Sequence, residues 1–386
     1  MDRIAGIVKI GPSLDPETAT TASRIAHRAI RVARWVCLGL CLLMVACAGT
    51  GGSGQAVHEY VFIPAPPEAP RLQFLTSYST DLDVLPPLSG FRRFIVGDRE
   101  GSSLGKPYGV AIHDGQILVC DTKAGAVAIF DLVNHEFEVL GLERNGRLRK
   151  PVNLAVDEDG TRYVADVGIR RIMIYDANNH FLRSLGEPES WTPSDVAIVG
   201  KRLYVADLQN ERVVVLEKAT GQVLLKIGGP ESETREQFLP TNLTVSDDGY
   251  LYVSDTGNAR VLKFDPRGRL VQQYGSLGLR VGQFVRPKGI AVDRKNLLYV
   301  ADASSQVVQI FDPEGKLLLF FGGMGNEPGN LSLPAKVVID YDHVDLFADR
   351  VAPGHEIEYL VIVTSQYGSR MVNVFGFLKQ GRSKND

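Results

Sequence analysis

Residues 286–302 read RPKGIAVDRKNLLYVAD, and variants of this pattern recur along the chain. A proline, an apolar run and a closing aspartate return in residues 106–121, 150–166, 192–207 and 239–255, and a sixth start, LPAKVVID, stands at 333–340. The marker prolines are Pro107, Pro151, Pro193, Pro240, Pro287 and Pro334, separated by 44, 42, 47, 47 and 47 residues. A period of about 40–50 residues with several strands in each unit is typical of β-propeller blades.

Each repeat divides into four short segments of β type. In residues 289–322 they read GIAVD, LLYVAD, VVQIFD and KLLLFFG. These segments are rich in β-branched and aromatic residues, and turn sequences such as DPEG separate them. No sustained helical period follows residue 60. The pattern predicts an all-β fold, a six-bladed β-propeller of four-stranded blades.

The repeats resemble NHL repeats. The Asp-x-x-Asn-x-Arg feature of that family is best kept in Asp255, Asn258 and Arg260, and the third repeat keeps it in residues 207–212. The other repeats drift from it, because Val307 replaces the arginine in the fifth and the asparagine is lost in the first. The resemblance covers residues 71–378 and implies a six-bladed propeller. It does not imply a particular activity.

The last repeat predicts how the ring closes. Its first segment is followed by an insertion, residues 341–358, and the closing tail, residues 379–386, contains no fourth strand. Residues 71–79 (RLQFLTSYS) match the fourth segments of other repeats. An open array would leave unpaired sheet edges, whereas closing a long loop costs entropy that grows only logarithmically with length. We therefore expect residues 71–79 to complete the last blade.

The first 46 residues have the anatomy of a secretory signal. Four arginines precede an uncharged run, Trp35 to Ala46, whose twelve residues at about 1.5 Å each are too short to cross a hydrocarbon core of about 30 Å. The sequence MVAC at residues 44–47 resembles a bacterial lipobox, which implies lipidation of Cys47. An uncleaved membrane anchor is the alternative. Either interpretation predicts an exported protein tethered to the cell envelope, on the periplasmic side of either membrane or at the cell surface.

Composition narrows the partners of the exported part. Without residues 1–46 the chain keeps 36 basic and 42 acidic side chains, a net charge of −6, which disfavours nucleic acid. Cys120 is the only cysteine after Cys47, so no internal disulfide is expected, and it aligns with a small alanine of other repeats. We expect a monomeric propeller, attached to the membrane by its lipid, with an envelope protein as partner.

Three segments interrupt or precede the repeats. Residues 47–70 are predicted to be a linker, glycine- and serine-rich and then proline-rich. Residues 81–105 and 341–358 are long loops expected on opposite faces of the disk, since successive strands alternate in direction. Such loops bind partners or cap the core. The second contains His343, His355 and several acidic residues, a composition compatible with a bound cation or with a solvated surface.

One aspartate follows the second strand in five repeats. Repetition in every blade indicates an architectural role, in which the carboxylate accepts backbone N–H bonds in the next turn, because a catalytic site is needed only once. These residues are Asp121, Asp166, Asp207, Asp255 and Asp302.

The second position after each marker proline varies and is predicted to ring one mouth of the central channel. The residues there are Gly109, Asn153, Asp195, Asn242, Gly289 and Lys336. Some six-bladed enzymes, the gluconolactonase-like hydrolases among them, hold a divalent ion on such oxygen ligands. Lys336 would lie opposite Asp195, where it would repel a metal and could pair with the carboxylate instead. A metal site, a small-ligand site and a structural polar plug all fit this pattern.

The sequence thus favours binding over catalysis. No paired-histidine zinc motif is present in the chain, and no catalytic residue or cofactor is assigned. The leading hypothesis is a tethered interaction module that binds an envelope protein through a propeller face and its long loops. The alternatives are a metal-dependent hydrolase or lyase with its site at the channel mouth, and a sensor of a small ligand.

Overall fold

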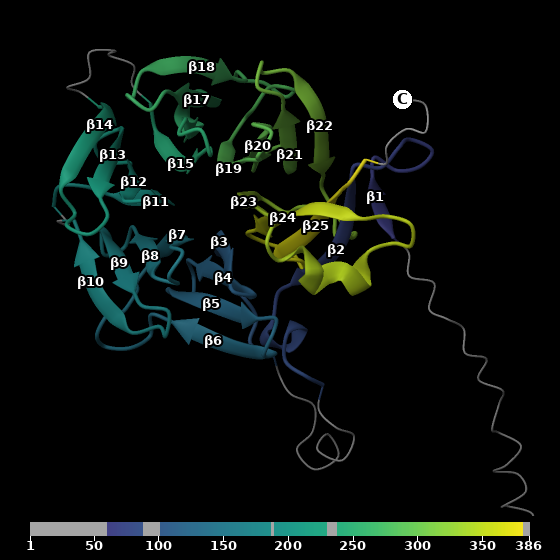
Figure 1. The fold of residues 1–386 in the computed structure, drawn as a ribbon, viewed down its shortest axis with the longest axis horizontal. Helices are drawn as coiled ribbons and strands as arrows, with labels where there is room; N and C mark the ends of the chain where they lie inside the picture. Colours follow the sequence, from purple (N-terminus) through teal and green to yellow (C-terminus); the bar gives the residue numbers. More distant parts are fainter. Residues whose placement is uncertain (1–59, 88–100, 187–188, 230–237, 381–386) are drawn as a thin grey trace, which may run out of the picture. The chain divides into compact units, whose positions relative to one another are not determined.

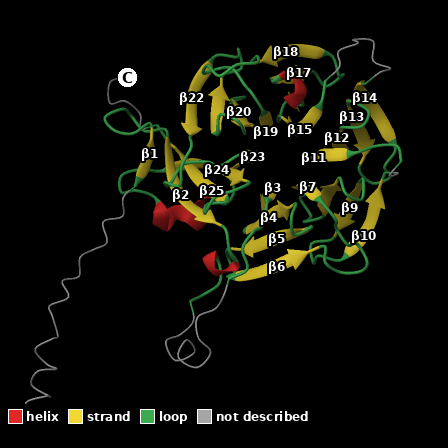
Figure 2. Cartoon of the chain, turned by 180° about the vertical axis from the view of Figure 1, so that it is seen from behind, coloured by secondary structure: helices red, strands yellow, loops and turns green. Residues whose placement is uncertain are grey.

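The computed structural model describes residues 60–87, 101–186, 189–229 and 238–380. The predicted signal, Cys47 and residues 47–59 of the predicted linker lie outside these ranges, as do residues 88–100 of the first long loop. The described part is almost entirely β-structure, arranged as six antiparallel sheets around a centre (Figures 1 and 2). No helix in the described ranges has the length and apolar character needed to cross a membrane.

Five blades contain four strands each, in chain order from the centre outward. Blade 1 is β3 (Pro107–His113), β4 (Gln116–Asp121), β5 (Ala126–Asp131) and β6 (Glu136–Leu140). Blade 2 is β7 (Pro151–Val156), β8 (Arg162–Asp166), β9 (Arg171–Tyr175) and β10 (Phe181–Leu185). Blade 3 is β11 (Pro193–Val199), β12 (Arg202–Asp207), β13 (Arg212–Glu217) and β14 (Val223–Gly228). Blade 4 is β15 (Pro240–Val245), β16 (Leu251–Asp255), β17 (Arg260–Phe264) and β18 (Leu270–Tyr274). Blade 5 is β19 (Pro287–Val292), β20 (Leu298–Asp302), β21 (Val307–Phe311) and β22 (Leu317–Gly322).

Blade 6 joins the two ends of the repeat region. Its inner strands are β23 (Pro334–Asp340), β24 (Ile357–Ser365) and β25 (Val372–Leu378), and β2 (Leu72–Tyr78) pairs antiparallel with β25. The register sets Leu72 opposite Phe377 and Tyr78 opposite Val372. Figure 1 shows purple β2 beside yellow β25. The predicted closure by the N-terminal strand is therefore confirmed.

The sixth sheet has a strand that the sequence did not predict. β1 (Val61–Ile63) pairs antiparallel with β2, giving the order β1-β2-β25-β24-β23. Assigning all of residues 47–70 to a linker was therefore wrong for residues 61–63. β1 is only three residues long and precedes Pro64, Pro66 and Pro67, so the sequence pattern there does not indicate a strand. It covers the outer edge of the closing strand.

The core of the molecule lies between the blades. Within the described residues, the buried apolar side chains form six clusters, each shared by two neighbouring blades. Each inner strand also contacts the next around the ring, and β23 contacts β3. Removing one blade would expose two clusters to water, so the blades stabilise one another.

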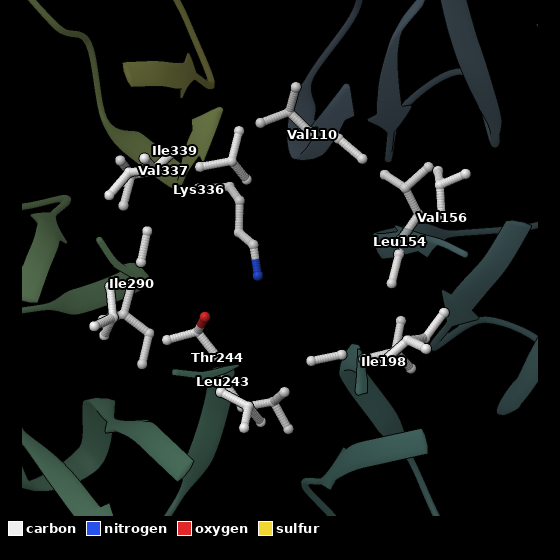
Figure 3. Close-up of a pocket in the computed structure, with 18 of the residues that line it drawn as sticks. Val110, Leu154, Val156, Ile198, Leu243, Thr244, Ile290, Lys336, Val337 and Ile339 are labelled. Atoms are coloured by element: carbon white, nitrogen blue, oxygen red, sulfur yellow. The ribbon is translucent and has the colours of Figure 1, made fainter. Parts of the chain in front are cut away.

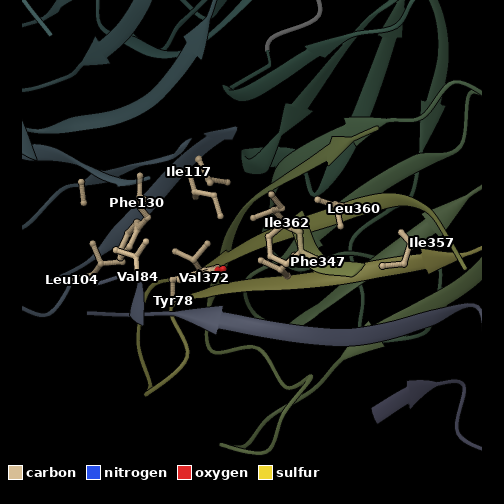
Figure 4. Packing of buried hydrophobic residues seen from close by; sticks show 14 of the residues in the cluster. Tyr78, Val84, Leu104, Ile117, Phe130, Phe347, Ile357, Leu360, Ile362 and Val372 are labelled. Carbon is tan, nitrogen blue, oxygen red and sulfur yellow. The ribbon is translucent and has the colours of Figure 1, made fainter. Parts of the chain in front are cut away.

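The ring has two distinct faces. We call the face where the inner strands begin the start face; it carries the connections from outer strands to the next inner strands and the turns between second and third strands. The other, the end face, carries the insertion of blade 6. In that insertion η3 (Val344–Arg350) buries Phe347, which is 1% exposed, in the cluster between blades 6 and 1 (Figure 4). The Gln73 amide donates to the carbonyl of Arg350 at 2.7 Å and accepts from the Ala352 N–H at 3.0 Å. This loop caps the core.

Candidate functional site at the centre of the ring

The repeated aspartates clamp the backbone, as predicted. Asp166 is fully buried, and its carboxylate accepts the N–H groups of Arg149 and Lys150, just before β7, and of Gly168 and Ile169 in its own turn. Asp121 and Asp302 make the same set of contacts in their blades. Asp207 and Asp255 each accept one N–H group from the residue before the inner strand, Thr192 and Leu239. Their remaining donors are an asparagine and an arginine, the residues of the Asp-x-x-Asn-x-Arg feature. Ser365 occupies this position in blade 6, where it accepts the Ser332 N–H.

A buried ion pair crosses the centre of the ring. The Lys336 ammonium of blade 6 donates to Asp195 Oδ2 of blade 3 at 2.5 Å. The two side chains are 7% and 0% exposed. Asp195 also accepts the N–H groups of Leu243 and Val196 at 2.9 and 2.8 Å. With this many donors, the carboxylate has little capacity left for a metal ion or for acting as a general base.

The two asparagines are buried beside this pair. The Asn242 amide donates to Asp195 Oδ2 at 3.3 Å, and its oxygen accepts the Tyr108 hydroxyl from the opposite blade at 3.5 Å. Asn153 donates to the Ser194 carbonyl at 3.0 Å, while its side-chain oxygen is buried without a partner in the described residues. Asn153, Asp195 and Asn242 are each 0% exposed. The structure thus brings all four predicted residues together, buried across the channel.

Side-chain hydrogen bonds from the inner or second strand of one blade to the inner strand of the next link neighbouring blades around this plug. Besides Asn153, they come from Ser194 to the Pro240 carbonyl, from Ser254 to the Lys288 carbonyl and from Thr364 to the Tyr108 carbonyl. These bonds join blades 2 to 3, 3 to 4, 4 to 5 and 6 to 1.

Glycines stand at the two remaining junctions, where a Cβ atom would collide with the neighbouring inner strand. A Cβ on Gly109 would lie 2.6 Å from Cα of Asn153, and one on Gly289 would lie 2.3 Å from Cα of Lys336. Only glycine fits such a separation. The glycines at this position therefore have a packing role.

A second buried lysine was missed by the sequence analysis. Lys288 is 8% exposed, and its Nζ lies 4.8 Å from the centroid of the Tyr108 ring. Burial, followed by the positive charges of Arg286 and Lys106, lowers the pKa of Lys288 to about 8. Burial likewise raises the pKa of Tyr108, and Asp195 adds to that effect. Lys288 follows its marker proline by one position, so comparing the residues one position after each proline would have found it.

A cavity of about 360 Å³ lies along the inner strands, towards the end face from the plug. Residues of all six inner strands line it, with the Lys336 side chain extending into its centre (Figure 3). Val110 and Ala111 pack into different inter-blade clusters, because successive side chains of a strand point to opposite faces of the sheet. The inner edge of the strand therefore faces the cavity, which offers backbone polar groups together with partly exposed aliphatic side chains.

Within the described ranges, no group of three or more His, Cys, Asp or Glu side chains is placed to hold a metal ion. In the blade 6 insertion, His343 contacts Asp340 at 2.9 Å, and the ring of His355 lies 4.9 Å from that of Phe62. A cation at the channel mouth would need the carboxylate of Asp195, and the ammonium of Lys336 is already paired with that carboxylate. The described residues do not fit a divalent ion.

Cys120 is buried between blades 1 and 2, at the position where β8, β12 and β20 carry alanine. Burial is the largest cause that raises the pKa of its thiol, and the carboxylate of Asp166 adds to it. The thiolate is the reactive form, so Cys120 is an inert core residue at neutral pH.

Comparisons with known proteins agree with this fold. No protein-family model matches the chain. Among solved structures, a gluconolactonase from Xanthomonas campestris is 16% identical, with a TM-score of 0.52, over 80% of this chain and 90% of its own. A streptogramin B lyase is 14% identical, with a TM-score of 0.50, over 71% of this chain and 94% of its own. The chain has the fold of a six-bladed β-propeller, which these structures share.

A curated relative matches a smaller part of the chain. A probable peptidyl-alpha-hydroxyglycine alpha-amidating lyase of Caenorhabditis elegans is 24% identical over 146 residues. That match spans 36% of this chain and 42% of the relative, less than half of its length. The relatives with named activities are propeller enzymes, and the likeness to the solved structures is one of fold.

Proposed function

We propose that this protein is an exported, lipid-tethered interaction module that binds an envelope protein through its start face. One observation carries the proposal. The loop between β18 and β19 exposes Leu277, Leu279 and Val281, whose exposed fractions are 72%, 85% and 64%. Met324, 79% exposed, stands on the next connection of the same face. Large apolar side chains gathered on one face are typical of a protein-binding surface.

The exposed loop is held in a fixed shape. Its backbone closes through bonds from the Gly278 N–H to the Phe284 carbonyl and from the Phe284 N–H to the Ser276 carbonyl, both 2.9 Å. The Gly282 N–H donates to the buried Gln309 side chain at 2.7 Å. Phe284 is 0% exposed and anchors the loop in the core. A preorganised loop loses little conformational entropy on binding, so its apolar area contributes more to affinity.

The other exposed apolar residues have a different setting. Several, such as Leu182, Val271 and Phe320, lie on the outermost strands, where single apolar side chains are ordinary. On the end face, the blade 6 insertion packs Phe347 into the core and is hydrogen-bonded to Gln73 of β2. These contacts of the insertion stabilise the fold itself. This division favours the start face over the end face as the docking surface.

Tethering is the part of the proposal that rests on sequence. The basic region, the short apolar run and Cys47 support export and lipid attachment. Replacement Cys47→Ser is expected to abolish labelling by a fatty-acid analogue and to release the protein from membranes. Continued labelling of the variant would contradict lipidation at this residue.

Crosslinking in the native envelope tests the docking surface. We expect one partner to crosslink near residues 276–284 and to be lost with the double replacement Leu279→Asp and Val281→Asp. Val133→Asp, at a position 58% exposed on the end face, is the matched control and keeps the partner. Equal recovery of the same partner by the double variant would contradict docking through this loop.

The metal-dependent hydrolase or lyase receives less support. The carboxylate it would use, Asp195, is paired with Lys336 and accepts two backbone N–H groups. If the purified protein contained stoichiometric calcium or zinc, and if the replacement Asp195→Asn removed the metal, the hydrolase or lyase hypothesis would be supported instead.

A further inference from the structure

The buried start of the inner strands has an unbalanced charge. Among the two residues that follow each marker proline, the charged ones are Asp195, Lys288 and Lys336, one negative and two positive. Lys336 is paired with Asp195. Lys288 forms no ion pair with a described carboxylate, and its contact is the face of the Tyr108 ring.

Further positive charge surrounds Lys288 on the start face. Arg286 precedes the marker proline of blade 5 and is exposed; Lys106 precedes that of blade 1 and is half-buried. Both are near enough to contribute to the lowered pKa of Lys288. Lys106 Nζ lies 5.4 Å from the ring centroid of Tyr367, and in the described ranges neither cation forms an ion pair with a carboxylate. Lys288 contacts Tyr108 across the start face, and Arg286 and Lys106 stand two residues before these two residues. The three cations therefore belong to the start-face ends of blades 1 and 5, and blade 6 contributes the ring of Tyr367.

We propose that Lys106, Arg286 and Lys288 form a binding site for a small oxyanion, a carboxylate or a phosphate, at the start-face mouth of the channel. A buried ammonium without a counter-charge destabilises the fold. An anion that pairs with it removes this destabilisation, and the free energy gained strengthens binding of the anion. Arginine presents a planar fork that matches both kinds of oxyanion. The Tyr108 ring holds the lysine in place by a cation–π contact. Arg286 is the last residue of the connection between β18 and β19, so the site adjoins the apolar docking loop but uses none of its apolar side chains.

The test is calorimetric titration of the purified full-length protein with inorganic phosphate and, separately, with succinate, at fixed ionic strength. We expect one site per chain. Lys288→Met, which keeps the apolar stem of the side chain, should weaken binding at least tenfold, the effect of losing one charge-assisted hydrogen bond. Arg286→Gln alters an exposed side chain and should weaken binding severalfold in a protein that folds normally. Lys123→Met, an exposed lysine on the same face, is the control and should leave binding unchanged.

The two anions distinguish the sources of the ligand. Binding of phosphate alone identifies a phosphorylated ligand, binding of succinate alone a carboxylate, and binding of both a general oxyanion site; each supports the proposal if Lys288→Met and Arg286→Gln weaken it. Absence of binding by either anion overturns it. Binding that both variants retain at full strength also overturns it, because the anion would then lie elsewhere.

Discussion

At the residue scale, the repeated aspartate decides whether a blade keeps its shape. Asp255 is fully buried, accepts the Leu239 N–H at 2.9 Å and pairs with Arg260 at 2.8 Å. Replacement Asp255→Ala would remove a buried carboxylate that accepts both of these bonds. We expect a loss of unfolding free energy of about 3–5 kcal/mol, measured by urea denaturation. Asp247→Ala, in an exposed turn of the same blade, is the control; equal losses for the two variants would contradict the clamp.

Lys288 gives a prediction with a defined pH dependence. Its folded pKa, about 8, is lower than the usual 10.5, so the folded state binds fewer protons than the unfolded chain between these values. The cost of the buried charge is therefore complete below pH 8 and is relieved as the pH rises towards 10.5. Lys288→Met should be more stable than the natural protein by on the order of 1–3 kcal/mol at pH 7, with the difference shrinking above pH 8. Thermal unfolding in anion-free buffer checks this; a difference that stays constant with pH would contradict it.

Part of the polar group at the centre of the ring could be predicted from the sequence. Ring order alone predicted that Lys336 faces Asp195, because blades 6 and 3 are opposite in a ring of six. The sequence also placed Asn153, Asp195 and Asn242 at a channel mouth, whereas the structure buries them. Lys336 and Tyr108 reach across the channel to Asp195 and Asn242, and a repeat pattern carries no information about where such long side chains extend.

At the element scale, β2 is the strand on which the ring depends. A chain that begins at Ser79, without β1 and β2, would leave the edge of β25 unpaired and would expose two inter-blade clusters. We expect its unfolding midpoint to fall by about 10 °C or more. A chain that begins at Tyr60 is the control and should unfold like the full-length protein. An unchanged midpoint in the shorter chain would show that the ring does not need this strand.

The contact between β2 and the blade 6 insertion can be tested by itself. Gln73→Ala removes both hydrogen bonds to the segment of Arg350 and Ala352 and should cost about 1–3 kcal/mol in unfolding free energy. Ser77→Ala, at a half-buried position of the same strand, provides the comparison. If the Gln73 variant loses no more than the Ser77 variant, the insertion is not fastened through this amide.

Element boundaries show where sequence patterns are informative. The four segments predicted for residues 289–322 agree with β19 to β22, because β-branched runs separated by turn sequences recur five times and support one another. β1 has no repeated counterpart and is followed by prolines, so it read as linker. The capping role of residues 341–358 could not be predicted from the sequence either. In η3 the buried side chain is Phe347, and one buried residue produces no recognisable pattern.

At the scale of the whole molecule, the ring separates two kinds of surface. The end face is closed over blade 6 by an insertion that belongs to the core, whereas the start face carries the ordered apolar loop and the cationic mouth of the channel. Fold class and blade number followed from the period of the marker prolines. The docking surface did not, because exposed leucines and valines become meaningful only after the structure separates the surface from the core.

The central claim is that the chain forms a closed ring of six sheets, sealed by a strand from its N-terminal side. Hydrogen exchange measured by mass spectrometry on the full-length protein tests it most directly, by comparing peptides that cover Leu72–Tyr78 with peptides that cover Val372–Leu378. Paired strands in one cooperative ring should show matched, slow exchange, governed by unfolding of the whole molecule. Exchange of Leu72–Tyr78 within seconds, while Val372–Leu378 stays protected, would contradict the closure.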